Sequence, residues 1–383
     1  MKLKLKNTPE QVELIKALGS KDANVAAEAS TAFAAFIGPV IQKVINQAST
    51  AGLIFSDNLY DEDDSPSYPL DLYYDEGVGY INTWSQTIAG GMPTSQVEGV
   101  KEMKISTYRL DSAVSFLKKY ARKSRLDVIS KALERMAQEV LIKQERNAWS
   151  VIMKALADAR STVSTAASTG HVFASMAPNQ FKVHDLSRLM TLMRRLSGSF
   201  ASGTPAGADS YGLTDLFVSP EVKQEVRGFA YQPMNTYTTG GGGVALPDNV
   251  REDMFRAAGT NEIYGVRITD LIELGDGQKY TKLFRTFNQA SSGTPTVAHS
   301  SSSTDDGTQG GTMSNTVDDL IVGIDASREA FVRPVATQHD SGGSFVALPD
   351  DQFASRADKT GFYGFLEEGR VCIDSRAIVG MVV

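Results

Sequence analysis

The longest regular pattern in the sequence lies between residues 126 and 160. Its apolar residues recur at steps of three, four or multiples of these: Leu126, Ile129, Leu133, Met136, Val140, Ala148, Ile152 and Leu156. Because such steps place side chains on one face of an α-helix, the pattern predicts one amphipathic helix. At 1.5 Å per residue this helix would be about 50 Å long. Few globular domains need a helix of that length, so we expect a structural strut.

Other helices are predicted on both sides of the strut. Thr8 can cap a helix that has Pro9 in its first turn and ends near Gly19. The alanine-rich stretch 22–50 has a helical pattern, and Pro39 is expected to kink or split it. Further helices are predicted over 183–197, from Ser219-Pro220-Glu221 to about Arg227, and over about 249–258.

A long two-stranded hairpin is predicted between residues 78 and 110. Val78 to Trp84 is rich in strand-forming residues, Gly90 to Pro93 is a turn, and Met103 to Tyr108 alternates on the way back. An isolated two-stranded ribbon is only marginally stable in water. We therefore expect the hairpin to lie on another subunit.

The second half of the chain reads mainly as strands. They are predicted over 213–218, 263–268, 280–287, 320–324, 330–335, 369–374 and 377–383. A linker rich in serine, threonine and alanine (161–175), four glycines (240–243) and a glycine- and serine-rich excursion (288–316) separate some of these elements. A long helix combined with an antiparallel sheet predicts the α+β class.

Composition bounds the class of protein. The chain has 383 residues, 42% of them hydrophobic, which suffices for one large domain or two to three interleaved ones. A formal net charge of -7 argues against a general DNA-wrapping role. The lone Cys372 precludes an intrachain disulfide and suits a cytosolic origin. No apolar run reaches the roughly 18 residues of a membrane span, so a soluble protein without membrane contact is expected.

Two charged segments stand out. Residues 53–76 contain eight carboxylates and no lysine or arginine, namely Asp57, Asp61, Glu62, Asp63, Asp64, Asp71, Asp75 and Glu76. Pro66 and Pro69 preclude a regular helix there, so an extended acidic segment is predicted. The opposite charge gathers just before the strut, at Lys118, Lys119, Arg122, Lys123 and Arg125.

The sequence contains no recognisable catalytic, cofactor-binding or metal-binding constellation. A calcium loop starting at Asp61 would need glycine at its sixth position and glutamate at its twelfth, where Pro66 and Leu72 stand. Gly240 to Gly243 is not followed by the lysine of a phosphate-binding loop. His339-Asp340-Ser341 are adjacent and cannot adopt the geometry of a catalytic triad. We expect no enzyme, cofactor or metal.

The order of these elements resembles the major capsid proteins of tailed bacteriophages, which have the HK97 fold. Four local segments resemble sequence motifs that are common in that family: Phe217 to Glu221, Ile263 to Ile268, Asp319 to Asp325 and Asp374 to Val379. None is specific alone, and their order and spacing carry the resemblance, which covers nearly the whole chain.

The resemblance implies a division of the chain into the parts of that fold. These are an N-terminal arm (1–65), an E-loop hairpin (66–110), a P domain with the spine helix (111–200, helix about 126–160), an A domain (about 201–330) and returning P/A strands (331–383). Shell maturation in the family needs hinges, for which residues 111–125 are the candidate.

The resemblance also implies a function. Copies of the chain would form pentamers and hexamers of an icosahedral virion shell around double-stranded DNA, after synthesis in the host cytoplasm. No additional scaffolding domain is recognised, so scaffolding would come from a separate protein or be dispensable, and portal and decoration proteins are further possible partners. The alternatives are an encapsulin-type bacterial nanocompartment and a hydrolase without a recognisable motif.

The candidate inter-subunit contacts are Asp57, Asp61, Glu62, Asp63, Asp64, Trp84, Lys118, Lys119, Arg122, Lys123 and Arg125. In one interpretation the acidic arm of one subunit meets the basic start of the spine helix of its neighbour. In the other, the basic residues face packaged DNA. The sequence leaves both open, and Trp84 and Trp149 are predicted packing anchors.

Overall fold

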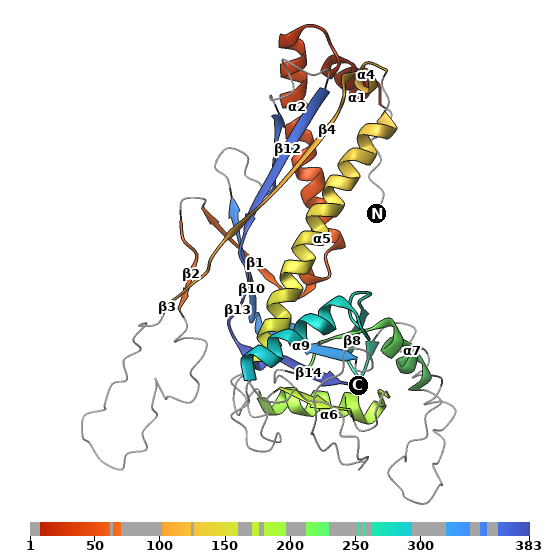
Figure 1. Cartoon of the computed structure of the whole chain (residues 1–383), viewed down its shortest axis with the longest axis vertical. Coiled ribbons are helices and arrows are strands. Elements are labelled where there is room, and N and C mark those ends of the chain that lie inside the picture. The colour runs from red at the N-terminus through yellow and green to blue at the C-terminus, as the bar shows by residue number, and fades with distance from the viewer. Residues whose placement is uncertain are drawn as a thin grey trace, which may run out of the picture. The chain divides into compact units, whose positions relative to one another are not determined.

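The computed structural model describes residues 8–61, 64–69, 102–123, 126–159, 171–175, 180–196, 212–229, 252, 256, 262–292, 319–337, 345–350 and 359–383. These residues form two compact units (Figure 1). Unit 1 takes its residues from the chain up to Ala148 and from Phe331–Val371, and unit 2 from Trp149–Ala330 and Cys372–Val383. Helix α5 (Leu126–Asp158, 33 residues) carries the chain from unit 1 into unit 2. The predicted strut is confirmed almost to the residue.

Unit 1 is built on a mixed sheet. Its strands follow the order β1 (Ser56–Asp61), β10 (Phe331–Thr337), β12 (Lys359–Glu368) and β11 (Phe345–Asp350), and β4 (Tyr108–Leu117) pairs with β12. Strand β1 runs parallel to β10, from Ser56 opposite Val332 to Asp61 opposite Thr337. The β4–β12 pair is antiparallel over ten positions, with Tyr108 opposite Glu368. The first and last thirds of the chain therefore share this sheet.

The helices of unit 1 pack with this sheet around one core. They are α1 (Pro9–Leu18), α2 (Ala23–Ala48), η1 (Ala51–Leu53), α4 (Lys118–Arg122) and the first part of α5. The core includes Ile15, Leu18, Phe33, Ile37, Ile41, Ile129, Leu133, Met136, Phe345 and Phe362. Asp22 caps α2 by accepting from the backbone N–H of Asn24 over 3.1 Å.

The described part of the predicted N-terminal arm (1–65), mainly residues 8–61, packs within unit 1. Residues 9–61 form two helices and a paired strand within unit 1, and Leu18 and Ile41 have almost no exposed surface. The helical spacing of their apolar residues gives α1 and α2 a face that packs on the unit's own core. Helix α2 continues through Pro39 as one element, so the split does not occur and the kink, the other predicted effect, stays a prediction.

Among the residues that the structure describes, one helix is long and apolar enough to cross a membrane by length and composition alone, over Ala23–Lys43 of α2. The high hydropathy of this window comes from alanines interspersed with larger apolar residues. A helix that could cross a membrane was not expected from the sequence. Ala29, Phe33 and Ile41 of the same window are part of the unit 1 core. A core helix passes the same test, so the finding is weak evidence for a membrane.

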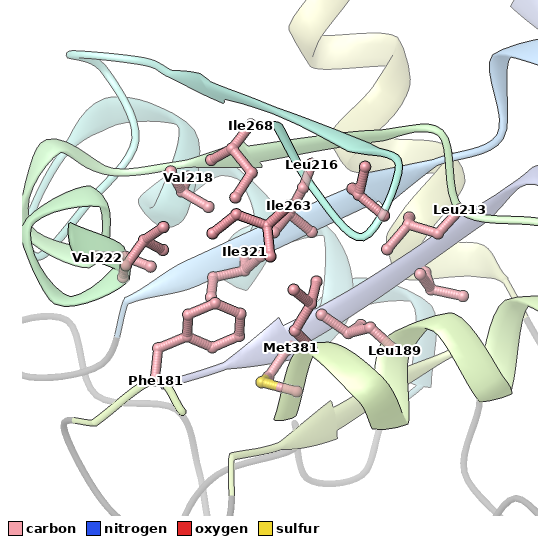
Figure 2. Packing of buried hydrophobic residues seen from close by; sticks show 14 of the residues in the cluster. Phe181, Leu189, Leu213, Leu216, Val218, Val222, Ile263, Ile268, Ile321 and Met381 are labelled. Atoms are coloured by element: carbon pink, nitrogen blue, oxygen red, sulfur yellow. The ribbon is translucent and has the colours of Figure 1, made fainter. Parts of the chain in front are cut away.

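Unit 2 has its own six-stranded sheet. The strand order is β5 (Val172–Ala174), β14 (Ile378–Val382), β9 (Leu320–Ile324), β6 (Asp215–Val218), β8 (Val266–Asp270) and β7 (Glu262–Ile263). Helices α6 (Val183–Leu196), α7 (Pro220–Gly228) and α9 (Lys279–Ser292) belong to the same unit. Figure 2 shows how Leu216, Ile321 and Met381 of the sheet meet Leu189 of α6 in the core.

Several predicted elements of unit 2 are confirmed. Helix α6, strand β9 and strand β14 lie where the sequence pattern placed them. The predicted cap of α7 is present, because Ser219 accepts from the backbone N–H of Val222 over 3.1 Å. Trp149 is fully buried, and its ring centroid lies 5.1 Å from that of Phe217. The helix predicted at about 249–258 falls mostly outside the described residues.

Two strand predictions in unit 2 are wrong. Residues 280–287 belong to helix α9, where Tyr280 and Phe284 are buried four positions apart on one helical face. Their aromatic composition suggested a strand, although their spacing is helical. The stretch 263–268 is a tight hairpin of β7 and β8, because Tyr264 (φ 52°) and Gly265 (φ 78°) both take the left-handed conformation of its turn.

The predicted hinge at 111–125 stays a prediction, and the structure shows regular elements over most of its described residues. Strand β4 extends to Leu117 and is paired with β12 at every position, and α4 follows at once. Its alternation of exposed and half-buried residues from Tyr108 to Ser115 is the pattern of a regular strand. A segment with a complete ladder of backbone hydrogen bonds is a poor hinge.

Candidate assembly surface

A short two-stranded sheet is formed by residues that lie between β1 and β4 in the sequence. Strand β2 (Ser67–Pro69) pairs antiparallel with β3 (Glu102–Lys104), and Ile105 N donates to Pro66 O over 3.0 Å. Within the described ranges, no third strand joins this pair. The predicted hairpin therefore has its paired base at 67–69 and 102–104, whereas the predicted outgoing strand 78–84, with Trp84, lies outside the described residues.

Side chains tie this ribbon to the unit 1 sheet. Tyr60 and Thr107 donate their hydroxyls to Oε1 of Glu367 over 3.3 and 2.8 Å. Asn58 donates to the hydroxyl of Tyr68 on β2. The base of the ribbon is thus held to both β1 and β12.

Glu368, the residue after Glu367 and the last residue of β12, is the centre of a buried cluster. We call this cluster the charge hub. Glu368 has no exposed surface and accepts from four side chains. The distances are 2.7 Å from Tyr108 OH, 3.1 Å from Gln144 Nε2, 2.7 Å from Arg333 Nε, and 3.3 and 3.4 Å from Nε and Nη2 of Arg370. The hub thereby joins β4, α5, β10 and β12.

The charges of the hub compensate one another. Burial alone would raise the pKa of Glu368, but the guanidinium groups of Arg333 and Arg370 outweigh burial and lower it. Burial and the adjacent Glu368 carboxylate raise the pKa of Tyr108 to about 12, so its hydroxyl remains a donor. Arg333 also contacts Asp57 on β1, with Nη1 3.2 Å from Oδ1. The site is a buried joint in which two arginines pair with one carboxylate, although Nη1 of Arg370 is buried without a hydrogen-bond partner among the described residues.

A second carboxylate fixes the end of α2 to α5. Glu145 accepts from Ser49 Oγ and Thr50 Oγ1, each over 2.6 Å, and from Ala51 N over 3.2 Å. The backbone of η1 begins there. Together with the charge hub, this contact connects the N-terminal helices, β1 and the strut within unit 1.

The predicted acidic contacts divide into two groups. Asp57 is engaged by Arg333 of its own chain, so it is in part a structural residue. Asp61 and Asp64 are exposed, and Asp64 N donates to Asp61 O over 2.8 Å in a turn. Glu62 and Asp63 lie outside the described residues. Two carboxylates at the end of β1 therefore stay available to a partner.

The predicted basic contacts lie on and after α4. Lys119, Arg122 and Lys123 are exposed and Lys118 is half-buried, whereas Arg125 lies outside the described residues. Arg122 also has an internal role, because its Nε donates to Gly19 O at the end of α1 over 2.8 Å. Figure 1 shows β1 and α4 at different ends of unit 1. The structure does not bring the acidic and basic residues together within one chain.

The charge hub was not predicted from the sequence. Its one visible signal is Arg333, a charged residue in the middle of the apolar strand Phe331–Thr337. A buried arginine needs a carboxylate partner. That partner, Glu368, lies 35 positions away and could not be chosen among the acidic residues from sequence alone.

Unit 2 contains a different buried carboxylate. Asp319 accepts from the hydroxyl of Ser219 and from Leu320 N, the latter over 2.6 Å. Burial raises the pKa of Asp319 to about 6, in spite of these hydrogen bonds. Unlike Glu368, Asp319 has no arginine among the groups that shift its pKa, so its charged form is poorly compensated.

The cysteine and histidine side chains that were considered for catalysis or metal binding include Cys372 and His171 of unit 2. Burial raises the pKa of the Cys372 thiol to about 12, which opposes formation of a nucleophilic thiolate. The Nδ1 atom of the buried His171 lies 2.9 Å from Ile378 O. In the part of the chain that the structure describes, no group of three or more His, Cys, Asp or Glu residues could hold a metal ion. His339 to Ser341 lie outside that part.

Comparisons with known proteins found solved structures that are similar to this chain over most of its length. No family model matches the sequence, and no curated protein matches it. The capsid of an empty GTA particle has 15% identity and a TM-score of 0.46, with 87% of this chain and 90% of that chain covered. The capsid of cyanophage P-SCSP1u has 12% identity and a TM-score of 0.45, with 86% of each chain covered.

A third similar structure is a virus-like particle from Pyrococcus furiosus. It has 11% identity and a TM-score of 0.42, and the match covers 90% of this chain and 97% of that one. Identities this low permit no residue of these proteins to be transferred to the present chain.

Proposed function

We propose that this chain is a major capsid protein, whose copies assemble into the pentamers and hexamers of an icosahedral phage head around double-stranded DNA. The observation that carries the proposal is the β2–β3 ribbon, which has no third strand within the described ranges and is clamped at its base. A ribbon of two strands is marginal without a surface to lie on. The clamp of Glu367 and the charge hub fits an element that bears load between subunits.

The remaining parts fit the same role. We assign unit 1, with α5 as the spine helix, to the P domain and unit 2 to the A domain, with residues 66–110 as the E-loop. The N-terminal helices are part of unit 1 and not a separate arm. The function in this proposal is mechanical and non-enzymatic. The charge hub stabilises each subunit, and extended contacts hold neighbouring subunits together.

The exposed charges support a contact between copies. Asp61 and Asp64, at and after the end of β1, and Lys119 and Lys123, on and after α4, have opposite charge, and Figure 1 shows β1 and α4 apart within unit 1. Pairing across a subunit boundary would steer association and set its register more than it would add affinity. The rival candidate function for these lysines is contact with packaged DNA, whose phosphates they would neutralise.

Charge reversal separates the two roles. Lys118→Glu with Lys119→Glu should block assembly, and adding Asp61→Lys with Asp64→Lys should restore it. The matched control is Lys279→Glu with Lys282→Glu, which makes the same charge change on exposed positions of α9 in unit 2. Particles that form normally but retain their genome poorly would instead assign the lysines to DNA.

The proposal includes partners and a location. The chain would be made in the host cytoplasm and reside in the virion, with separate scaffolding, portal and decoration proteins as further partners. The alternative is a closed nanocompartment of the encapsulin type. Electron microscopy of the purified and the native assembly tests both: phage heads show a tail vertex and DNA, and a nanocompartment shows a small shell with protein cargo. Discrete small oligomers at all concentrations would contradict both.

A further inference from the structure

Helix α2 has two apolar faces, and the residues that the structure describes cover one of them. Ala29, Phe33, Ile37 and Ile41 pack into the core of unit 1. The opposite face is exposed and consists of Val25, Ala32, Ala35, Phe36 and Pro39, with Val25 and Phe36 41% and 44% exposed. At 100° per residue these five positions fall within an arc of about 100°. Only 33% of the apolar window of this helix is buried in the chain.

Exposure of such a face is unusual for a helix that already contributes to a core. Outward faces of surface helices are normally charged or polar. Glu28 and Lys43 are the only charged residues of α2, and both are exposed on the same side as the apolar face. They flank Ala32, Ala35, Phe36 and Pro39, with the negative charge on the N-terminal side and the positive charge on the C-terminal side, and Val25 lies beyond Glu28.

The order of residues on this face is self-complementary. When the face is laid antiparallel on a second copy about a point between Ala35 and Phe36, Ala35 falls opposite Phe36. In the same register Ala32 falls opposite Pro39, and Glu28 falls opposite Lys43. Each small residue thus receives a larger one, and each charge receives its opposite, twice by symmetry.

We propose that the exposed face of α2 (Val25, Glu28, Ala32, Ala35, Phe36, Pro39 and Lys43) is a two-fold contact in which the α2 helices of two copies pack antiparallel. The small residues let the helices approach to the usual 8–10 Å between axes. A second copy of the chain is the occupant, because a membrane or an unrelated partner would not require the pairing of Glu28 with Lys43. The inference stands whether or not the assembly is a capsid.

The contact should be weak by itself. One helix pair buries much less than the roughly 1,200–2,000 Å² of a stable interface. It would add to other contacts in an assembly and should be measured in the unassembled chain, at high protein concentration and low ionic strength, where surface charges are least screened.

The test uses two full-length variants, Glu28→Lys and Lys43→Glu. Each alone places like charges opposite one another at both ends of the contact, whereas a mixture of the two variants pairs lysine with glutamate at both ends. Sedimentation velocity should show self-association about tenfold weaker for each variant alone and restored for the equimolar mixture. Glu13→Lys and Lys16→Glu, on exposed positions of α1, are matched controls that should change nothing.

Two results would overturn the proposal. One is unchanged self-association of both variants, or no recovery in the mixture. The other is flotation of the wild-type chain with phosphatidylcholine vesicles without self-association, which would assign the apolar face to lipid. A second variant, Phe36→Ser, should weaken self-association and should not be rescued by mixing with either charge variant, which separates loss of packing from charge repulsion.

Discussion

Arg333 donates its Nε hydrogen to Oε2 of Glu368 across 2.7 Å, in a place where Glu368 has no exposed surface. The contact joins β10 to β12, and Tyr108 and Gln144 bring β4 and α5 to the same carboxylate. The unit 1 sheet and the strut are therefore joined through one charged group.

The first prediction follows from this dependence. Glu368→Gln leaves Arg333 and Arg370 buried with less compensation, which should cost unit 1 about 3–5 kcal/mol of unfolding free energy. Urea denaturation followed by circular dichroism measures the change. Glu367→Gln, one position away and half-buried, keeps an oxygen that can accept from the hydroxyls of Tyr60 and Thr107, and should cost at most about 1 kcal/mol because it weakens only these two bonds. Equal losses of unfolding free energy in both variants would contradict the prediction that Glu368 contributes more to stability than its neighbour.

The second prediction concerns pH and Asp319. Its pKa in the folded chain is about 6, above the value of about 4 expected in the unfolded chain. The stabilisation from its proton is complete below pH 4 and is lost as pH rises through 6. Between pH 4 and pH 8 the wild type should lose up to about 3 kcal/mol relative to Asp319→Asn. Parallel pH profiles in calorimetry would show that Asp319 titrates normally.

Glu368 should behave in the opposite way. Its pKa is lowered in the folded chain, so its contribution is present above the unfolded value of about 4.3 and disappears as pH falls through the folded pKa. Unit 1 should therefore resist mild acidification to pH 5 and fail only at lower pH. Acid unfolding of the wild type compared with Glu368→Gln measures this, since the variant lacks the transition.

The third prediction tests the cap of α7. Ser219→Ala removes the acceptor for Val222 N and the donor to Asp319, and should destabilise unit 2 by about 1–2 kcal/mol. Ser187→Ala, at an exposed position of α6 in the same unit, is the matched control and should be nearly neutral. Thermal unfolding compares the two, and a neutral Ser219→Ala would contradict the capping role.

The fourth prediction concerns close packing at a glycine. A Cβ on Gly364 would lie 2.5 Å from Cζ of Phe345 and 2.7 Å from Cε of Met136. Gly364→Ala should therefore destabilise unit 1 by about 1–3 kcal/mol through overpacking. Gly228→Ala, where a Cβ meets nothing within 4 Å, should be neutral or slightly stabilising. A tolerated Gly364→Ala would mean that Phe345 can move aside.

Local signals predicted what local forces decide. The strut was predicted because its apolar spacing is helical over nine turns of pattern, and α7 because Ser219 and Pro220 form a standard helix start. Helix α9 was missed because the aromatic residues Tyr280 and Phe284 favour strands by composition. Tertiary packing of those rings on one face decided otherwise.

Long-range pairing lay beyond the sequence pattern. Tyr108 meets Glu368 only because β4 and β12 pair across 260 positions of the chain. The same limit applies to the N-terminal helices, whose apolar faces indicated burial but not whether their own chain or a neighbour would cover them. The acidic and basic candidates were visible in the sequence, but only the fold shows that Asp57 is held by Arg333.

The complete burial of Glu368 has a consequence for how salt acts on this chain. Dissolved ions cannot reach that carboxylate, whereas Asp61, Asp64, Lys119 and Lys123 stand in open solvent. If copies assemble through these exposed charges as proposed, concentrated sodium chloride should separate the assembly into folded subunits, and removing the salt should let the same subunits reassemble.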